Sequence, residues 1–393
     1  MSGRHFLQVP GPTNVPERIL RAMDRAVADH RGAELPPVVF EIVEGLRGAF
    51  RSGNGAIALF PGSGTGATEA AIVNTVNPGE RVLAFNNGMF SHLFADVARR
   101  HAIEVDEIEL GWDRGVPPDV VRDRLAADAD HTYAAVLLVH NETSTGATTD
   151  LAAVRRAIDA AGHPAMLIVD AVSSLASLEF RFDEWGIDVA LAGSQKGLML
   201  PPGLGLLCIG DRALRRAEHV TTPRAFFDWR PVLKEMERGY FPYTPATLLL
   251  YGLREALRML GEEGLPQVFA RHRRLADAVR AAIRAWELPM QCRESADYSH
   301  TLTAVVVPDG INSDAVRQAA ETHFNLSLGA GLGRLTGKVF RIGHLGALND
   351  LEVLATVAGT ELAMTVAGMR VPVGAGVAAA QQVLLERFRA PVR

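Results

Sequence analysis

The sequence predicts an α/β protein with a mostly parallel, doubly wound sheet and a smaller α/β domain towards its C-terminal end. From about residue 56, short apolar strands alternate with polar or glycine-containing loops and helix-like stretches, which is the pattern of a parallel sheet. The length of 393 residues fits two domains, or one large domain with a smaller companion. Near Gly264 the pattern changes to long helix-like segments with fewer strands.

The N-terminal segment precedes this alternation. The first twenty residues are rich in proline and glycine, so we expect an extended arm rather than a helix. The predicted strands of the large sheet are Ala56–Phe60, Arg81–Phe85, Ala134–Val139, Ala165–Val169 and Val189–Ala192. Helices are predicted after the first three strands, at Ala67–Val76, in the stretch ending at Arg100, and at Leu151–Ala161.

The second half predicts the smaller domain. A helix expected at Leu248–Glu263 ends the large domain. The helices of the smaller domain are expected at Gln267–Trp286, Ser313–His323 and Leu351–Ala367, and its strands at Thr301–Val307 and Lys338–Gly343. We therefore divide the chain into an arm (1–20), a large domain (21–263) and a small C-terminal domain (264–393). No internal repeat or low-complexity segment interrupts this division.

The composition excludes several classes of protein. Hydrophobic residues make up 48% and charged residues 22%, as in ordinary globular proteins. The net charge of −5 is not concentrated in a run of one sign, so we expect neither a nucleic-acid partner nor a membrane surface. Two cysteines cannot form a disulfide framework or a zinc cluster, which indicates a reducing compartment. Without a signal-like or spanning segment, the expected location is the cytoplasm.

Lysine is rare in this chain. It occurs only at Lys196, Lys234 and Lys338, and the other basic residues are arginine. Codon bias can explain this preference. However, an arginine side chain cannot form a Schiff base, because its guanidinium stays protonated in proteins. Any covalent chemistry that requires a primary amine on a lysine side chain is therefore limited to three positions.

A glycine-rich loop follows the first predicted strand. The segment from Gly62 to Gly66 precedes a helix, where backbone N–H groups and hydroxyls can hold a phosphate. The same spacing also fits a dinucleotide fingerprint, or a simple turn. The dinucleotide interpretation is disfavoured because the loop begins about sixty residues into the chain and no acidic strand end follows about twenty positions later.

Two polar residues follow neighbouring strands. Asp170 ends one apolar run and Lys196 follows another. Taken singly, Asp170 is as well explained by a helix N-cap, and Lys196 by a surface lysine whose stem covers apolar neighbours. Together with a phosphate loop they match the needs of pyridoxal 5'-phosphate (PLP), which takes a lysine at its aldehyde and an acid beside its ring nitrogen.

These residues lie in motifs that resemble the class V aminotransferases of PLP fold type I. Within that family the similarity is to the serine–glyoxylate and alanine–glyoxylate aminotransferases. The motifs cover nearly the whole chain: Pro10–Asn14, Asp29–Arg31, Ser63–Thr65, His140–Gly146, Asp170–Ser174, Gly193–Gly197, Gly239–Pro245 and Gly337–Gly343. The resemblance is specific for the family and less specific for the substrate.

The resemblance implies a role for each cofactor-binding residue. Lys196 would form the internal aldimine and then move a proton between the substrate α-carbon and the cofactor C4′. Asp170 would pair with the pyridinium nitrogen, with Val172 on one ring face and Phe90 on the other, where the family often has tryptophan. Thr143 would bind the phenolic oxygen or the substrate. The phosphate ligands would be Ser63, Gly64, Thr65 and Gln195.

The resemblance also implies a substrate site. Arg341 lies in an apolar strand, where it is either an exposed charge at a sheet edge or a bidentate clamp for the substrate α-carboxylate, and we favour the clamp. Gly11 of the arm would close over the same site. His30 and Arg31 either face a neighbouring active site or, in the case of Arg31, make a surface ion pair.

A two-fold partner is implied as well. Thr244, with Tyr240 or Tyr243, would reach a phosphate in the partner subunit, so we expect a homodimer with shared active sites, or a tetramer built from such dimers. The expected substrates are a small amino acid and a 2-oxo acid. Serine or alanine with glyoxylate is favoured. Aspartate or 3-hydroxyaspartate as donor and pyruvate as acceptor are alternatives.

Three competing functions are distinguishable. A PLP lyase of the desulfurase type needs a reactive cysteine, but Cys208 lies in a predicted core strand and nothing marks Cys292 as activated. A nucleotide-binding dehydrogenase would give no yellow protein and no borohydride-fixed lysine. A non-catalytic binding protein of the same fold would have no need to keep Lys196, Asp170 and Arg341 together.

Overall fold

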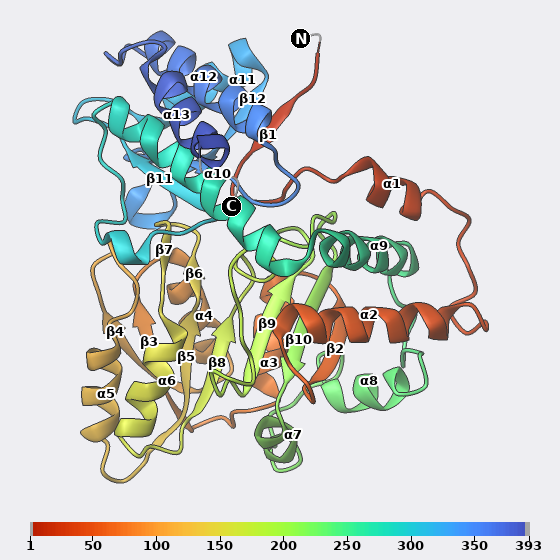
Figure 1. Cartoon of the computed structure of the whole chain (residues 1–393). Helices are drawn as coiled ribbons and strands as arrows, with labels where there is room; N and C mark the ends of the chain where they lie inside the picture. Colours follow the sequence, from red (N-terminus) through yellow and green to blue (C-terminus); the bar gives the residue numbers. More distant parts are fainter. Residues whose placement is uncertain (1–2, 390–393) are drawn as a thin grey trace.

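The computed structural model describes residues 3–389 and contains two sheets of unequal size (Figure 1). The large sheet has the strand order β2-β10-β9-β8-β5-β3-β4. Strand β10 is antiparallel to both of its neighbours, and the other neighbouring pairs are parallel. Its strands are β2 (Ala56–Pro61), β3 (Arg81–Asn86), β4 (Glu104–Glu109), β5 (Tyr133–Val139), β8 (Met166–Asp170), β9 (Val189–Gly193) and β10 (Leu204–Ile209).

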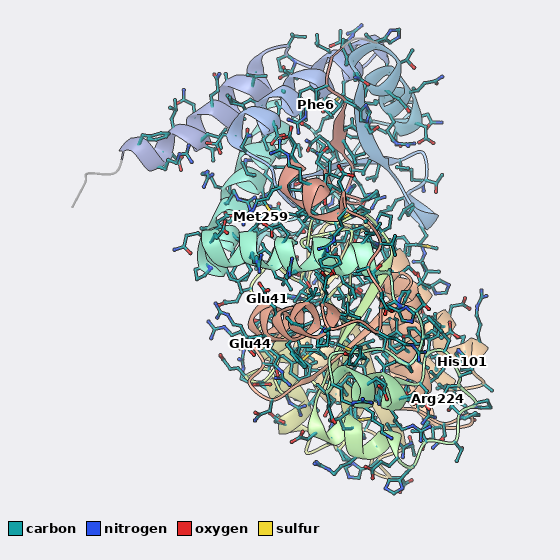
Figure 2. The ribbon with its side chains drawn as sticks, turned by 90° about the vertical axis from the view of Figure 1, so that its right-hand side faces the viewer. Phe6, Glu41, Glu44, His101, Arg224 and Met259 are labelled. Atoms are coloured by element: carbon teal, nitrogen blue, oxygen red, sulfur yellow. The ribbon has the colours of Figure 1, made fainter. Side chains whose placement is uncertain are left out.

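The helices of this part surround the large sheet (Figure 1). They are α2 (Leu35–Phe50), α3 (Gly64–Val73), α4 (Met89–Arg100), α5 (Pro118–Ala126), α6 (Leu151–Ala160), α7 (Asp211–Ala217), α8 (Trp229–Met236) and α9 (Thr247–Glu263). Helices α2 and α9 pack on one another, and Figure 2 shows them one above the other with Glu41 and Glu44 on α2 and Met259 on α9. An ion pair from Arg258 to Glu41 joins the two helices.

The smaller sheet lies at the other end of the molecule, with the order β1-β12-β13-β11. Its strands are β1 (Phe6–Gln8), β11 (Leu302–Val306), β12 (Leu326–Ala330) and β13 (Val339–Gly343). Helices α10 (Leu265–Ala285), α11 (Ser313–Phe324) and α12 (Asp350–Val366) contact this sheet, and α13 (Ala375–Arg389) packs on α10 and α12. A separate apolar core fills this end of the molecule. The predicted α/β class, with a mostly parallel large sheet and a smaller C-terminal part, is confirmed.

The arm differs from its prediction at both ends. Residues 9–16 are irregular, as expected, but Phe6–Gln8 pairs in parallel with β12 and so belongs to the smaller sheet. The expectation of no helix in the first twenty residues is wrong, because α1 spans Glu17–Met23. Pro16 stands directly before this helix, a position that tolerates proline, and Ile19 is fully buried. The domain limits 1–20, 21–263 and 264–393 remain a prediction.

Some short elements were not predicted from the sequence. A short hairpin of β6 (Asn141–Glu142) and β7 (Ala147–Thr148) follows β5. Short 3₁₀ turns occur at Ser295–Asp297 and Gly333–Leu335. Within residues 3–389, no helix has the length and apolar character needed to cross a membrane.

Candidate active site

A cavity of about 660 Å³ opens at the carboxyl ends of the parallel strands. Strand β8 ends at Asp170, which pairs with Val139 of β5 and Leu191 of β9. Nine residues predicted to form the site line this one cavity: Ser63, Gly64, Thr65, Phe90, Thr143, Asp170, Val172, Gln195 and Lys196. In open α/β sheets, ligands usually bind in the crevice at the carboxyl ends of the strands, where the strand order reverses.

The N-terminus of α3 forms one wall of the cavity. Ser63 is its N-cap, and its hydroxyl accepts a hydrogen bond of 3.3 Å from the Gly66 N–H. Gly64 and Thr65 are the first helical residues, so their N–H groups have no partners within the helix and favour an anion. A side chain at Gly64 would lie 2.8 Å from Cγ2 of Val172. Any larger residue at position 64 would therefore displace Val172.

Asp170 brings a carboxylate to the cavity. One of its oxygens accepts a hydrogen bond of 2.7 Å from the Val172 N–H. Burial is the main cause that raises its pKa to about 7, the charge of Glu142 adds to this, and Lys196 opposes it. No helix begins here, since residues 172–177 form turns, so the N-cap interpretation is wrong. A cation beside Asp170 would favour its ionised form.

Lys196 points inward. Only 9% of its surface is exposed, and its ammonium group donates a hydrogen bond to the carbonyl oxygen of Pro10. The interpretation as a surface lysine is therefore wrong. Burial lowers its pKa to about 8, with a further contribution from the charge of Arg341, while Asp170 opposes the shift. A lysine with a lowered pKa is a better nucleophile and base at neutral pH.

Arg341 lies on β13, between β12 and β11, so it is not at a sheet edge as one interpretation assumed. It is 7% exposed, and its guanidinium donates from Nε to the Ala330 carbonyl (2.7 Å) and from Nη1 to the Thr143 carbonyl (2.8 Å). Burial lowers its pKa to about 10, which leaves it protonated at neutral pH. Arg341 itself does not line the cavity, but its guanidinium contacts Thr143, which does.

The N-terminal arm lies against Gln195 and Lys196. Gly11 has a φ of +92°, and a side chain there would lie 2.6 Å from Nζ of Lys196. Thr13 fixes the arm through two hydrogen bonds, from its N–H to the Gln195 carbonyl (3.1 Å) and from its hydroxyl to the Lys196 carbonyl (3.2 Å). The Gln195 side chain lines the cavity, and its Oε1 is buried without a hydrogen-bond partner.

Four predicted residues lie away from the cavity of their own chain. Tyr240 and Arg31 line a separate hollow of about 620 Å³ together with Lys234. The ring of Tyr243 stacks on Phe226 at 4.9 Å between centroids, and its buried hydroxyl has no partner. Thr244 is exposed. Arg31 is also exposed. Its backbone N–H donates to the Asp29 carboxylate (2.9 Å) and its Nε contacts His30 Nε2 (3.4 Å), but its guanidinium forms no ion pair among the described residues, so that alternative is not observed.

Sequence reasoning missed other residues of the cavity. Asn141 lines it, and Glu142 lies directly behind it, although both belong to the motif His140–Gly146. Helix α3 adds Thr68 and Glu69, and helix α4 with its C-cap adds further lining residues: Leu93, Phe94, Asp96, Val97, Arg100 and His101. Helical periodicity after the glycine-rich loop would have predicted the residues of α3.

Comparison with known proteins decides the family. The family described as Aminotransferase class-V matches residues 5–333. The chain belongs to the class V aminotransferases. It is 48% identical to a serine–glyoxylate aminotransferase of Methylorubrum extorquens (98% of this chain, 97% of that one), and 44% identical to an L-aspartate–glyoxylate aminotransferase of Paracoccus denitrificans (97% and 96%). A solved ureidoglycine–glyoxylate aminotransferase of Bacillus subtilis superposes with a TM-score of 0.90 at 28% identity, covering 98% and 99%.

The class V aminotransferase family implies PLP as cofactor, and the predictions of this family and of PLP fold type I are confirmed. The cavity also fits the cofactor on its own chemistry. It combines a helix N-terminus for a phosphate, a buried carboxylate with a raised pKa for a ring cation, and a buried lysine for an aldehyde. The unpartnered Gln195 side chain adds a further polar group to that wall.

Proposed function

We propose that this class V aminotransferase binds PLP on Lys196 and transfers an amino group from a small L-amino acid to glyoxylate, giving glycine and a 2-oxo acid. Serine and alanine are the leading donors. The observation that carries the proposal is that Lys196, Asp170 and the α3 N-terminus line a single cavity. The names of the relatives, at 44–48% identity over nearly the full chain, support glyoxylate as the acceptor.

Each residue of the cavity has a chemical task in this proposal. Bound PLP supplies an electron-accepting ring, which makes a proton on the substrate α-carbon easier to remove. Asp170 stabilises a proton on the ring nitrogen, and Lys196 moves the α-proton through Nζ. Phe90 and Val172 cover the ring. Thr143 supplies a hydroxyl, and the phosphate is held by Ser63, Gly64, Thr65 and Gln195.

Substrate binding rests on Arg341 and the arm. Every candidate donor and acceptor has an α-carboxylate, and a protonated guanidinium can bind one with two parallel hydrogen bonds. In this structure two of its N–H groups hold the Ala330 and Thr143 carbonyls, which fixes the direction of the planar group. Gly11 closes over the site and excludes water from the carboxylate.

The active form is proposed to be a homodimer in which Thr244 of the partner subunit, with either of the two nearby tyrosines, reaches the phosphate. A tetramer of two such dimers is also compatible. The buried, unpartnered hydroxyl of Tyr243 and the solvent-facing position of Tyr240 leave both as candidates. The location proposed from the cysteine count is the cytoplasm.

An acidic donor, aspartate or 3-hydroxyaspartate, is the second candidate. It is favoured by the L-aspartate–glyoxylate aminotransferase at 44% identity. Such a donor needs a second cation for its side chain. The Arg31 guanidinium is exposed and forms no ion pair among the described residues, so it is available to meet the side chain of a donor bound in the partner's cavity. Pyruvate in place of glyoxylate is a further alternative for the acceptor.

A desulfurase is disfavoured by the state of both thiols. Cys208 is fully buried in β10, Cys292 is 4% exposed, and burial raises the pKa of each thiol to about 12. A nucleophilic thiolate requires the opposite shift and access to substrate. No cysteine of the described residues lines the cavity.

The deciding experiment combines labelling with a substrate panel. Borohydride reduction of the yellow protein should fix PLP on Lys196, and Lys196→Ala should lose both the label and transamination. Labelling at Lys234 or Lys338 with activity retained would contradict the proposal. Steady-state rates with serine, alanine and aspartate, each with glyoxylate and pyruvate, identify the substrates. Rapid turnover of aspartate that Arg31→Ala selectively removes would establish the acidic donor instead.

A further inference from the structure

A second buried carboxylate, that of Glu142, lies behind the cavity wall and has no role in the chemistry described above. Glu142 is fully buried in β6. No ion pair in the described part of the chain includes it. Instead, its oxygens accept hydrogen bonds from backbone N–H groups and a hydroxyl, in a site where an unsatisfied carboxylate would be costly.

Glu142 caps the helix that carries Phe90. Helix α4 begins after Gly88, which has no side chain to cap it. The Glu142 carboxylate accepts from the N–H groups of Phe90 (3.3 Å) and Ser91 (2.9 Å), the second and third residues of the helix. A side chain at Gly88 would overlap with that of Glu142. The position of Phe90 therefore depends on a residue 52 positions away in the sequence.

The same carboxylate orders the segment that contains Thr143. It accepts from the Ser144 N–H (3.0 Å) and hydroxyl (2.7 Å), and the Ser144 hydroxyl in turn accepts from the Met89 N–H (2.9 Å). Thr143 lies between Glu142 and Ser144 in the chain, and its carbonyl accepts a hydrogen bond from the Arg341 guanidinium. Glu142 thus links three parts of the proposed site: Phe90, which would cover the cofactor ring, Thr143, and Arg341, which would bind the substrate carboxylate.

Its charge also acts on the cavity. The negative charge of Glu142 favours the protonated forms of both Asp170 and Arg341, so it raises the pKa of each. The compensating positive charges are the α4 N-terminus, through its helix dipole, and Arg341. Removing the charge should therefore disfavour any proton bound nearby, an effect that a merely structural residue would not produce.

We propose that Glu142 is a positioning residue: through its hydrogen bonds to the start of α4 and to Ser144, it holds Phe90 and the Thr143–Arg341 contact in place. The inference rests on the proposed function, because it assigns these groups to PLP and substrate. It concerns how the described side chains are supported, so it can fail while transamination stands.

The test compares Glu142→Gln with Asp150→Asn in the PLP-loaded enzyme. Both replace a carboxylate by an amide at a helix N-terminus, since Asp150 caps α6 by accepting from the Ala153 N–H (2.9 Å), but α6 does not line the cavity. Glu142→Gln should lower kcat about tenfold, the effect of losing roughly 1.4 kcal/mol of support, whereas Asp150→Asn should leave kcat unchanged. Both should reduce thermal stability.

The charge readout is the pH midpoint of the visible absorbance change of bound PLP. In Glu142→Gln this midpoint should fall by about one pH unit, the usual size of a shift caused by one neighbouring charge, and in Asp150→Asn it should not move. A Glu142→Gln enzyme with the kcat and midpoint of Asp150→Asn would overturn the inference. This absorbance is measurable even if the wild-type protein does not transaminate, so the two failures are distinguishable.

If Glu142→Gln does not fold, Ser144→Ala tests the positioning. It removes the hydroxyl that links Glu142 to Met89 and keeps the charge. We expect kcat to fall several-fold with an unchanged midpoint. A wild-type kcat in Ser144→Ala would contradict the positioning of Phe90 and Thr143 by this network.

Discussion

The ammonium group of Lys196 donates a hydrogen bond to the main-chain carbonyl of Pro10. This contact joins the loop after strand β9 of the large sheet to the N-terminal arm. The arm is itself held by the smaller sheet, since β1 pairs with β12 and the Val9 carbonyl packs against Gly343. Lys196 therefore contacts a segment anchored in both parts of the molecule, and PLP bound on Lys196, as proposed, would replace this contact.

The first prediction concerns Gly11. Gly11→Ala would place Cβ 2.6 Å from Nζ and 2.8 Å from Cε of Lys196, in addition to the strain of a φ of +92°. We expect kcat/KM to fall about a hundredfold, as for a displaced reactive group, with less PLP fixed by borohydride. Gly79→Ala is the control, because Gly79 has a φ of +80° and open space around it. Equal losses in both variants would show that only backbone strain matters.

The second prediction concerns Asp170. Burial has raised its pKa to about 7, so the carboxylate needs a neighbouring cation to stay ionised at neutral pH. Asp170→Asn keeps the shape and the Val172 contact, but it cannot stabilise a protonated ring nitrogen. We expect turnover to fall about a hundredfold or more in steady-state assays. Near wild-type turnover would show that the carboxylate has only a structural role.

The third prediction concerns Arg341. Arg341→Ala should weaken all carboxylate substrates together, by about 2–5 kcal/mol in kcat/KM, because a buried charge pair loses one partner. Arg341→Lys keeps the charge but cannot make two parallel bonds while holding the Ala330 and Thr143 carbonyls. It should recover little of the loss. A loss confined to one donor would assign Arg341 to side-chain recognition instead.

The fourth prediction concerns acid stability. Burial lowers the pKa of His140 to about 4, and its Nδ1 has no hydrogen-bond partner. An unfolded histidine titrates near pH 6.5, so between about pH 6.5 and 4 the unfolded chain binds a proton that the folded chain excludes. This contribution to stability is present above pH 6.5 and is lost as the pH falls.

His140→Phe should remove that loss. The ring already packs edge-on against Phe180 and Trp185, at 5.5 and 5.6 Å, so a phenyl ring suits the site. Between pH 7 and pH 4.5, the drop in the free energy of unfolding should shrink by about 2–3 kcal/mol in urea titrations. His219→Phe, at an exposed histidine, is the control. An unchanged pH dependence would show that His140 titrates normally.

Most of the regular elements near the site were predictable, because their patterns are local. Strands β2, β3, β5, β8 and β9 are apolar runs bounded by polar loops, and each was predicted within a residue or two. Strand β4 was missed because it is an edge strand in which four of the six residues are charged and only Val105 and Ile108 are apolar. Helix α2 was missed because its sequence starts with two prolines, which usually indicate a loop.

The residue types and short motifs alone indicate the proposed chemistry. An amine on Lys196, a carboxylate on Asp170 and a glycine-rich turn at Gly62–Gly66 are properties of residue types, and their motifs are short enough to be read along the chain. Together with the family motifs, they predicted PLP, the family and nine of the 19 residues that line the cavity.

Only the tertiary structure decided how these groups are supported. Contacts from Lys196 to Pro10 and from Arg341 to Thr143 join residues 186 and 198 positions apart, and Glu142 caps a helix in an earlier unit of the sheet. Periodicity reports which face of one element is buried, but not which element will cover it. Burial then sets the pKa of Asp170 and Lys196, because it depends on neighbours that come together only when the two parts of the chain pack.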